Sequence, residues 1–464
     1  MMHIGQAARV VKGAHKGPDV EFTGVSTDSR TLGKGDLFVA IRGEKFDGHT
    51  FVAAAGKSGA AGAMVDTRFD LGSPRSGADF PLIVVDDTRL ALGSLAHYWR
   101  EQFSPLLIAV AGSNGKTTTK EMLASILRSA AGDENVLATS GNLNNDIGLP
   151  LTLMRMRAAH RLCAIELGMN HKGEIAYLAD IARPAVSVVT NAQREHLEFM
   201  GSVDEVAEEN AAVYRALADD GIAVINADDA HADAFRRAAG ARRVIDFALD
   251  RGAAVTGRYE LAPLSSTIRI RYGALESNAT LAIPGVHNIM NALAAAASAH
   301  AAGIAPEAIG RGLSAFRPYI GRLQVKKTKD GMTVIDDTYN ANPDSVRAAI
   351  DVLCGTSGRT VLVLGDMGEV GDEGPDFHSE IGRYARERGV STVLALGEST
   401  AHTVAAYGQG ARHFATIEDL SHALERMRDE GTTVLVKGSR FMRMERVVAA
   451  LLGTRSGGPA VKVH

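Results

Sequence analysis

A short glycine-containing stretch that follows an apolar run constrains the fold of this chain more than any other feature. The apolar run spans residues 106–111, and after it come Gly112, Ser113, Asn114, Gly115, Lys116, Thr117 and Thr118. Apolar residues then recur at helical spacing, at Met122, Leu123, Ile126 and Leu127. A buried strand, a tight turn and an amphipathic helix in this order predict a loop whose backbone N–H groups bind phosphate.

The residue types in this loop favour a nucleoside triphosphate, ATP or GTP, as the ligand. Lys116 supplies a mobile positive charge, and the Thr117 hydroxyl is a ligand for nucleotide-bound magnesium. The spacing is shorter than the usual G-x-x-x-x-G-K-[ST], because Val110 stands where the first glycine is expected. An ordinary strand–helix connection is the alternative, and the GKTT run after an apolar strand argues against it.

Length, charge and cysteine content bound the class of protein. A chain of 464 residues predicts about three domains at ~150 residues each. A net charge of -4 without basic blocks argues against nucleic acid as a partner. Cys163 and Cys354 fit no disulfide or metal pattern, which is typical of a reducing compartment. With no apolar signal segment and no run long enough to span a bilayer, we expect a soluble cytoplasmic protein without membrane insertion.

Strands that alternate with helices predict an α/β protein of three domains. Residues 1–103 read as a small α/β domain with a helix over 53–65, and residues 104–317 as a mostly parallel sheet around the phosphate loop. Residues 318–464 read as a second parallel α/β unit that ends in a frayed tail from Gly453.

Polar residues at strand ends near the loop are candidates for a metal site. Glu166 ends one predicted strand, and Asn191 ends the next, with His196 five residues later. A carboxylate and an imidazole beside a triphosphate suit magnesium, whereas either residue alone would read as ordinary core or surface. Asn288 and Asn291 open an alanine-rich helix on one face; Asn288 suits a helix N-cap, and both amides could address one flat base.

Ten motifs in order along the chain resemble those of the Mur ligase family. They are DSR with GDLFVAIRGEKFDGH, GSNGKTTTKEM, NLNNDIGLPLTL, ELGMNHKGEI, TNAQREHLEFMGS, INADD, HNIMNA, IDDTYNANPDS, GDMGEVG and VKGSRFMRME. The short G-x-x-G-K-T loop is a mark of that superfamily. DDTYNANPDS with GDMGEVG resembles the member that adds a dipeptide rather than an earlier residue.

This resemblance implies an N-terminal UDP-sugar domain, a central ATPase and a C-terminal Rossmann-like domain. It implies ATP-dependent, ADP-forming addition of D-alanyl-D-alanine to UDP-N-acetylmuramoyl-tripeptide through an acyl phosphate, in cytoplasmic peptidoglycan precursor synthesis. ATP and Mg²⁺ are the implied cofactors, and a monomer is expected.

The resemblance also implies roles for individual residues. Lys116, Glu166, His196 and Arg322 would be catalytic, and Thr117, Glu166 and His196 would hold magnesium. The implied substrate contacts are Ser29 and Arg30 for uridine, and, for ATP, Gly112, Ser113, Asn114, Gly115, Lys116, Thr117, Thr118, Asn288, Asn291, Arg322 and, at the ribose, Asp337.

One departure and two alternatives remain. Many Mur ligases carry a lysine, in several cases carbamylated, where this chain has Asn210, so the second magnesium would rely on His196, phosphate, water, or a carboxylate such as Glu208 or Glu209. A helix of surface acids is the favoured interpretation of those glutamates. Folylpolyglutamate synthetase shares the central motifs but lacks the N-terminal ones, and a nucleotide switch or scaffold would hydrolyse ATP without ligation.

Overall fold

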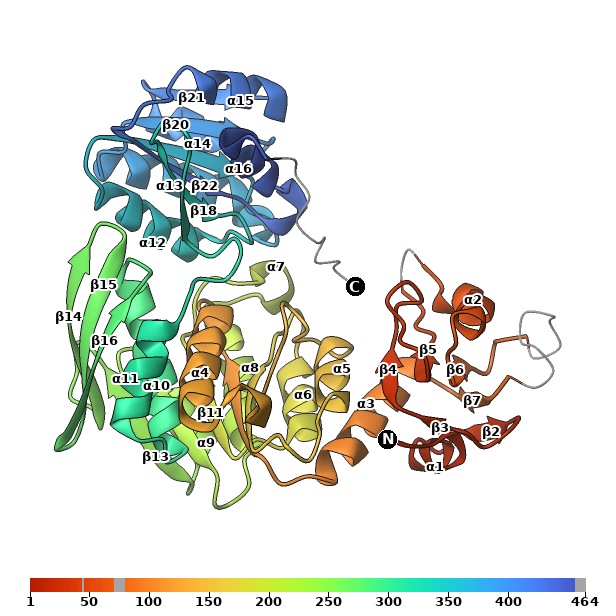
Figure 1. Cartoon of the computed structure of the whole chain (residues 1–464). Helices are drawn as coiled ribbons and strands as arrows, with labels where there is room; N and C mark the ends of the chain where they lie inside the picture. The colour runs from red at the N-terminus through yellow and green to blue at the C-terminus, as the bar shows by residue number, and fades with distance from the viewer. Residues whose placement is uncertain (44–45, 71–79, 455–464) are drawn as a thin grey trace.

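The computed structural model describes residues 1–43, 46–70 and 80–454, and its strands form one two-stranded pair and sheets of five, nine and six strands. Helices cover these mostly parallel sheets, which confirms the predicted α/β class (Figure 1). Most of the tail predicted from Gly453 lies outside the described residues. Within the described ranges, no helix is long and apolar enough to cross a bilayer.

Strand β8 (Leu106–Ala111) lies inside the nine-stranded sheet, which accounts for its unbroken apolar sequence. Ile108 and Val110 belong to one hydrophobic cluster, whereas Leu107, Ala109 and Ala111 belong to another. Because successive side chains of a strand point to opposite faces, both faces of this strand are buried. The predicted apolar run is therefore a central strand of a parallel sheet.

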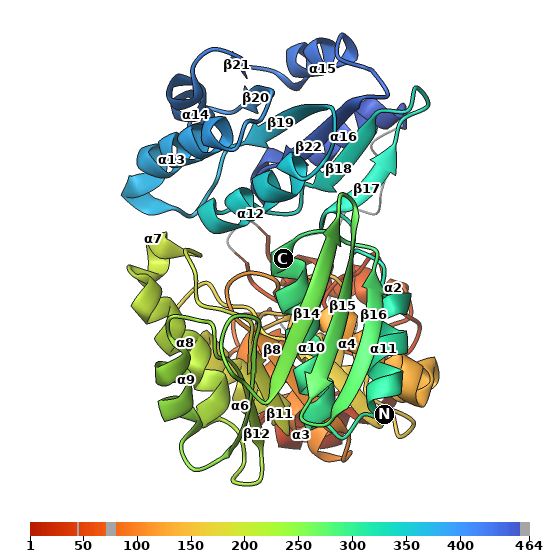
Figure 2. The ribbon, with the colours of Figure 1, turned by 90° about the vertical axis from the view of Figure 1, so that its left-hand side faces the viewer.

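The nine strands follow the order β16-β15-β14-β13-β12-β11-β8-β10-β9, and pairing is parallel from β14 to β9. Strands β14, β15 and β16 pair antiparallel and form a long extension at one edge of the sheet (Figure 2). The sequence patterns did not predict this extension. The remaining bounds are β9 (Val136–Ala138), β10 (Leu162–Glu166), β11 (Val186–Val189), β12 (Ile222–Asn226), β13 (Arg243–Ala248), β14 (Val255–Ala262), β15 (Ser265–Tyr272) and β16 (Leu275–Leu281).

Helices pack on both faces of this sheet, and α4 follows the loop directly. Buried side chains of α4 and α10 lie in one cluster, and those of α6 and α8 lie in the other. The bounds are α4 (Lys116–Ala131), η2 (Asp133–Asn135), α5 (Gly148–Met154), α6 (Glu174–Ala182), α7 (Leu197–Met200), α8 (Val203–Arg215), α9 (Ala232–Ala239), α10 (Val286–Ala301) and α11 (Pro306–Ala315).

The N-terminal part has a five-stranded sheet in the order β2-β7-β6-β5-β4 and a pair β1–β3. The helix predicted over 53–65 is wrong beyond Lys57, because Gly59 has a φ of +93° and residues from Gly62 join the sheet as β6. The bounds are β1 (Met2–His3), α1 (Ile4–Val10), β2 (Ala14–Lys16), β3 (Glu21–Phe22), β4 (Gly24–Ser26), β5 (Asp36–Val39), η1 (Gly48–Phe51), α2 (Val52–Lys57), β6 (Gly62–Asp66), β7 (Leu82–Val85) and α3 (Thr88–Glu101).

The C-terminal part has a six-stranded sheet in the order β17-β18-β22-β19-β20-β21, parallel except for β17. The bounds are β17 (Gln324–Lys327), β18 (Thr333–Asp337), α12 (Pro343–Cys354), β19 (Arg359–Gly365), η3 (Gly371–Glu373), α13 (Gly374–Glu387), β20 (Thr392–Leu396), α14 (Thr400–Tyr407), β21 (Ala411–Phe414), α15 (Ile417–Glu425), β22 (Thr432–Lys437), η4 (Arg440–Met442) and α16 (Glu445–Leu452).

The N-terminal and C-terminal sheets lie on different sides of the central one (Figure 1). Helix α3 joins the N-terminal sheet to the central part, where the Trp99 indole N–H donates to the Met156 carbonyl at 3.1 Å. Helices α12 and α7 lie where the C-terminal and central parts meet in both views (Figures 1 and 2). The carboxyl end of β8, which carries the loop, therefore faces the C-terminal part.

Candidate functional site

In the loop between β8 and α4, the first backbone N–H groups are hydrogen-bonded within the protein and the later ones are not. The N–H of Gly112 donates to Asn210 Oδ1 at 2.7 Å, and those of Ser113 and Asn114 donate to the carbonyl and side chain of Asn191, each at 2.9 Å. Within the described residues, the N–H groups of residues 115–118 have no such acceptor. These four groups open helix α4, whose dipole adds to their affinity for an anion.

Lys116 bends back over the loop in this structure. Its ammonium donates to the carbonyls of Gly112 and Ser113 at 2.6 and 2.9 Å, and to the Glu195 carboxylate at 3.0 Å. The side chains of Lys116 and Glu195 are each 11 % exposed, so this ion pair is only partly screened by solvent. The ammonium therefore lies at the start of the loop, and its predicted phosphate contact stays a prediction.

Glu166, at the end of β10, fits a magnesium ligand. Its Oε1 accepts from the Thr117 hydroxyl at 3.2 Å and from the Asn144 amide at 2.8 Å. Its Oε2 is buried and has no hydrogen-bond partner within the described residues. A buried carboxylate oxygen without a partner is costly unless a cation completes it, so the residues present fit Mg²⁺ beside Thr117.

His196 contacts a residue of the C-terminal part, Glu369. Its Nδ1 is 2.6 Å from Glu369, which follows β19, and its Nε2 is 3.6 Å from Glu195. Burial opposes protonation, but the two carboxylates outweigh it and raise the pKa of His196. Within the described residues, no group of three or more His, Cys, Asp or Glu side chains is gathered for a metal.

Helix α10 places Asn288 and Asn291 against the loop. The Asn291 amide donates to Asn288 Oδ1 at 3.1 Å, and the Asn288 amide donates to the Pro284 carbonyl at 2.7 Å. A Cβ on Gly115 would lie 2.1 Å from Asn291 Oδ1, so only glycine fits there. The prediction that Asn288 and Asn291 lie on one face of the helix is confirmed. The prediction that Asn288 is the N-cap is wrong, because Gly285 is the N-cap and Asn288 lies in the first turn.

The C-terminal candidates Arg322 and Asp337 have well-defined surroundings. The Arg322 guanidinium stacks over Tyr339 with 4.1 Å to the ring centroid. Asp337 Oδ2 accepts from the Lys437 ammonium at 2.6 Å, and burial lowers the pKa of this lysine. Within the part of the chain that the structure describes, neither side chain forms a hydrogen bond with the loop, so their contacts with a nucleotide stay a prediction.

Ser29 and Arg30 follow strand β4 in the N-terminal part. In Figure 1, β4 lies well away from helix α4, which follows the phosphate loop. The Arg30 guanidinium forms two hydrogen bonds of 2.6 Å with Asp28, and its side chain is 57 % exposed. A substrate that reaches both this turn and the loop has to be long.

Sequence reasoning missed a set of contacts that bring the C-terminal part to the loop. Arg194 forms ion pairs with Asp344 at 2.6 Å and with Glu380 at 2.7 Å. The Asn342 amide donates to Asn114 Oδ1 at 2.9 Å, so the loop itself contacts the N-cap of α12. The available signal was the polar NAQREH run after β11, because residues at strand ends of parallel sheets commonly contact ligands or neighbouring domains.

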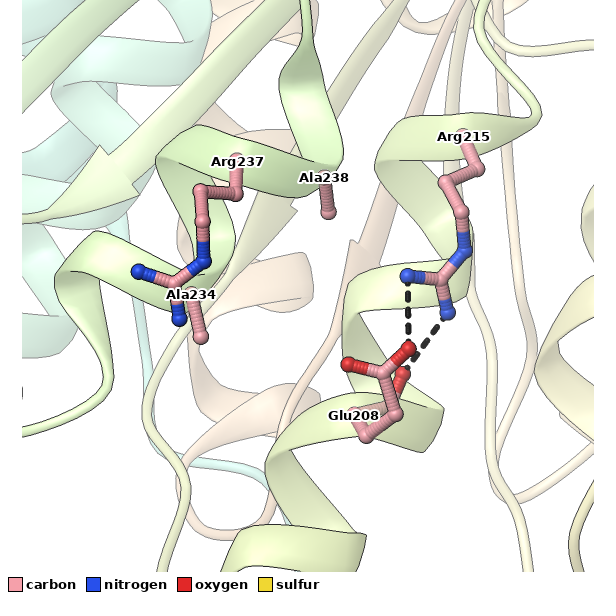
Figure 3. A pocket seen from close by; sticks show the side chains of 5 residues that line it. All are labelled: Glu208, Arg215, Ala234, Arg237 and Ala238. Carbon is pink, nitrogen blue, oxygen red and sulfur yellow. Dashed lines mark hydrogen bonds and ion pairs between the residues drawn. The ribbon is translucent and has the colours of Figure 1, made fainter.

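The glutamates weighed as metal ligands point elsewhere. Glu209 accepts from the N–H groups of Gly173 and Ile175, both at 2.8 Å, and so caps helix α6. Glu208 pairs with Arg215 at 2.8 Å beside a surface groove between α8 and α9 (Figure 3). Neither carboxylate faces the loop, and the surface-acid reading holds for Glu208.

The fold and the loop define an α/β protein of the nucleotide-binding class, with a glycine-containing loop between a central parallel strand and a helix. Three family models match the chain: "Mur ligase family, catalytic domain" over residues 21–100, "Mur ligase middle domain" over 110–299, and "Mur ligase, glutamate ligase domain" over 321–440. The chain belongs to the Mur ligase family.

Relatives and solved structures agree with this. The UDP-N-acetylmuramoyl-tripeptide–D-alanyl-D-alanine ligase of Escherichia coli K12 is 38% identical over 97% of this chain and 98% of its own. A crystal structure of MurF from Acinetobacter baumannii superposes with a TM-score of 0.89 at 35% identity, covering 98% and 99% of the two chains. MurF ligase from Thermotoga maritima, solved with ADP, gives 0.81 at 26% identity over 93% and 97%.

Proposed function

We propose that this chain is an ATP-dependent ligase that adds D-alanyl-D-alanine to UDP-N-acetylmuramoyl-tripeptide, a step of peptidoglycan precursor synthesis. The observation that carries the proposal is the phosphate loop with four free N–H groups beside Glu166, in a chain that aligns over almost its whole length with a ligase of that name. We further propose that it acts in the cytoplasm and as a monomer.

Catalysis in this proposal is positioning and charge neutralisation. Lys116 and the free N–H groups of the loop would hold the triphosphate, while Thr117 and Glu166, with help from His196, would hold Mg²⁺, which supplies charge neutralisation between the phosphates and the incoming carboxylate. Asn288 and Asn291 would contact adenine, Asp337 the ribose and Arg322 the phosphates. Ser29 and Arg30 would contact the uridine end.

The reaction needs no side-chain nucleophile. The terminal carboxylate of the tripeptide attacks the γ-phosphorus of ATP, the bond to the bridging oxygen breaks, and ADP leaves. The amine of D-alanyl-D-alanine then attacks the acyl carbon of the acyl phosphate. The tetrahedral adduct loses a proton and expels inorganic phosphate, which leaves an amide bond.

We propose three domains, residues 1–103, 104–317 and 318–464. This division is supported by the three sheets, whose described strands fall within residues 14–85, 106–281 and 324–437. A UDP-sugar on the first domain and ATP on the second would then be enclosed by the third.

The test is release of ADP and phosphate with each substrate alone and with all together. We expect ADP only when ATP, a UDP-tripeptide and D-alanyl-D-alanine are all present, with one amide formed per ADP. A nucleotide switch would release ADP without the dipeptide, and that result would overturn the proposal. Parallel assays with the lysine and the diaminopimelate tripeptide identify the third residue of the acceptor.

A further inference from the structure

The side chain of Asn210 lies buried beneath the first residue of the phosphate loop. Asn210 is on helix α8 and is only 1% exposed. Its Oδ1 accepts from the Gly112 N–H at 2.7 Å, and its amide nitrogen donates to the Val206 carbonyl at 3.0 Å. Both ends of the amide are therefore satisfied, and its orientation is fixed.

An asparagine amide meets two demands that the common substitutes cannot. The side chain at this position has to accept from the Gly112 N–H and donate to the Val206 carbonyl at the same time. A lysine ammonium has only donors, and an ionised aspartate has only acceptors. Replacement by an apolar side chain leaves the buried Gly112 N–H without a partner.

Gly112 is also contacted by the lysine of the same loop. Gly112 has a φ of +121°, and a Cβ there would lie 2.2 Å from the Thr190 hydroxyl, so only glycine fits at this position. Because glycine has a flexible backbone, contacts from other residues have to fix its conformation. Its carbonyl accepts from Lys116 at 2.6 Å. Asn210 on one side and Lys116 on the other thus hold the same residue, and movement of Gly112 would displace the lysine.

We propose that Asn210 is a positioning residue for nucleotide binding: it fixes Gly112 so that the four free N–H groups and Lys116 face the phosphates together. This inference rests on the proposed ATP-dependent function. The proposal gives Asn210 a specific role in this chain. Many Mur ligases have a lysine at this position.

A merely structural role is the competing explanation, since a buried amide would also stabilise α8. The two roles predict different changes in the melting temperatures of the free and the ADP-bound protein. A structural residue lowers the melting temperature of the free and the ADP-bound protein alike, whereas a positioning residue reduces the stabilisation that ADP adds, because that gain follows nucleotide affinity.

The experiment measures binding of ADP with Mg²⁺ by calorimetry, and the ADP-induced rise in melting temperature, on the full chain. Asn210→Leu removes both hydrogen bonds at similar volume, and Asn210→Ala is the less crowded second variant. Thr152→Val is the matched control, because Thr152 is fully buried and donates to the Gly148 carbonyl at 2.9 Å on helix α5, away from the loop.

We expect both Asn210 variants to bind ADP about tenfold more weakly and to show a smaller ADP-induced rise, with binding of UDP-tripeptide unchanged. Thr152→Val should lose stability but keep ADP affinity. Folded Asn210 variants that bind ADP within about twofold of wild type would overturn the inference while leaving the ligase function standing. A wild-type protein that binds no ADP would instead overturn the proposed function, and this inference with it.

Discussion

Lys116, the proposed phosphate contact, is held by its own loop in this structure. Its ammonium contacts two loop carbonyls and Glu195, so it is held in place before any phosphate arrives. A phosphate that contacts this ammonium has to replace one of these partners, because an ammonium has three N–H donors. The same contacts mean that its removal affects both charge and loop geometry.

The first prediction concerns this lysine. Lys116→Ala should lower ligation by roughly a thousandfold at saturating ATP, because no other mobile cation reaches the loop within the described residues. The fold should persist, as judged by circular dichroism and the melting temperature. Lys57→Ala, at an exposed lysine at the end of α2, is the control and should retain full activity. Near wild-type turnover of Lys116→Ala would contradict the assignment.

A second residue-scale prediction concerns pH and the N-terminal sheet. Hydrogen bonds from Arg42 and then Arg68 outweigh burial and hold the pKa of Asp66 well below its ordinary value of 3.8. Because the folded pKa is depressed, the stability from Asp66 is complete above pH 3.8 and declines as the pH falls below it toward the folded value.

Thermal melts of wild type and Asp66→Asn between pH 7 and pH 3 measure this contribution. We expect the variant to be less stable at neutral pH and the difference to shrink at the acid end. A difference that grows on acidification would show the opposite linkage. Asp372→Asn, at an exposed carboxylate on η3, serves as the control.

At the scale of elements, three consecutive residues of helix α8 contact three different parts of the molecule. Glu208 pairs with Arg215 on the surface, Glu209 caps α6, and Asn210 reaches the loop. Consecutive residues on a helix point about 100° apart, so one turn can serve solvent, a neighbouring helix and a binding site. This helix therefore joins α6 to the loop but offers no carboxylate to a second magnesium.

The third prediction follows from the composition of that helix. A carbamate needs an amine, and no lysine occurs in the sequence between Lys172 and Lys326. Lys172 itself pairs with Glu205 at 2.7 Å on the surface. We expect equal ligation rates in carbonate-stripped buffer and in buffer with added bicarbonate. Reversible activation by bicarbonate would show that a lysine is carbamylated after all.

At the scale of the whole molecule, the central and C-terminal parts share one hydrophobic cluster and are also joined by polar contacts close to the loop. Arg194 binds Asp344 and Glu380, His196 faces Glu369, and Asn114 contacts Asn342. These contacts start from the same two loops that surround the phosphate site. We therefore expect ligand binding there to depend on the position of the C-terminal part.

The fourth prediction is that ATP and UDP-tripeptide together draw the C-terminal part closer. Small-angle scattering should show a smaller radius of gyration with a non-hydrolysable ATP analogue and UDP-tripeptide than without them. Arg194→Ala should enlarge the free protein and raise the KM for ATP, because two ion pairs across the junction are lost. Identical dimensions in all states would contradict closure by hinge motion.

The sequence by itself determined the local features of the site. An apolar run followed by G-x-x-G-K-T-T defines strand, turn and helix through short-range geometry, and Glu166 and Asn191 sit at strand ends because the parallel sheet ends there. These features depend on residues close together in the chain, so pattern and spacing are sufficient to find them.

Only the tertiary structure decided what depends on residues far apart. Asn210 lies 98 residues from Gly112, and Asn342 lies 228 residues from Asn114, so neither pairing leaves a mark in local sequence. The antiparallel strands β14–β16 and the helix that ends early at Lys57 were likewise decided by long-range pairing and packing. Buried polar groups must find partners somewhere, but which partner they find is fixed when the sheets and helices pack together.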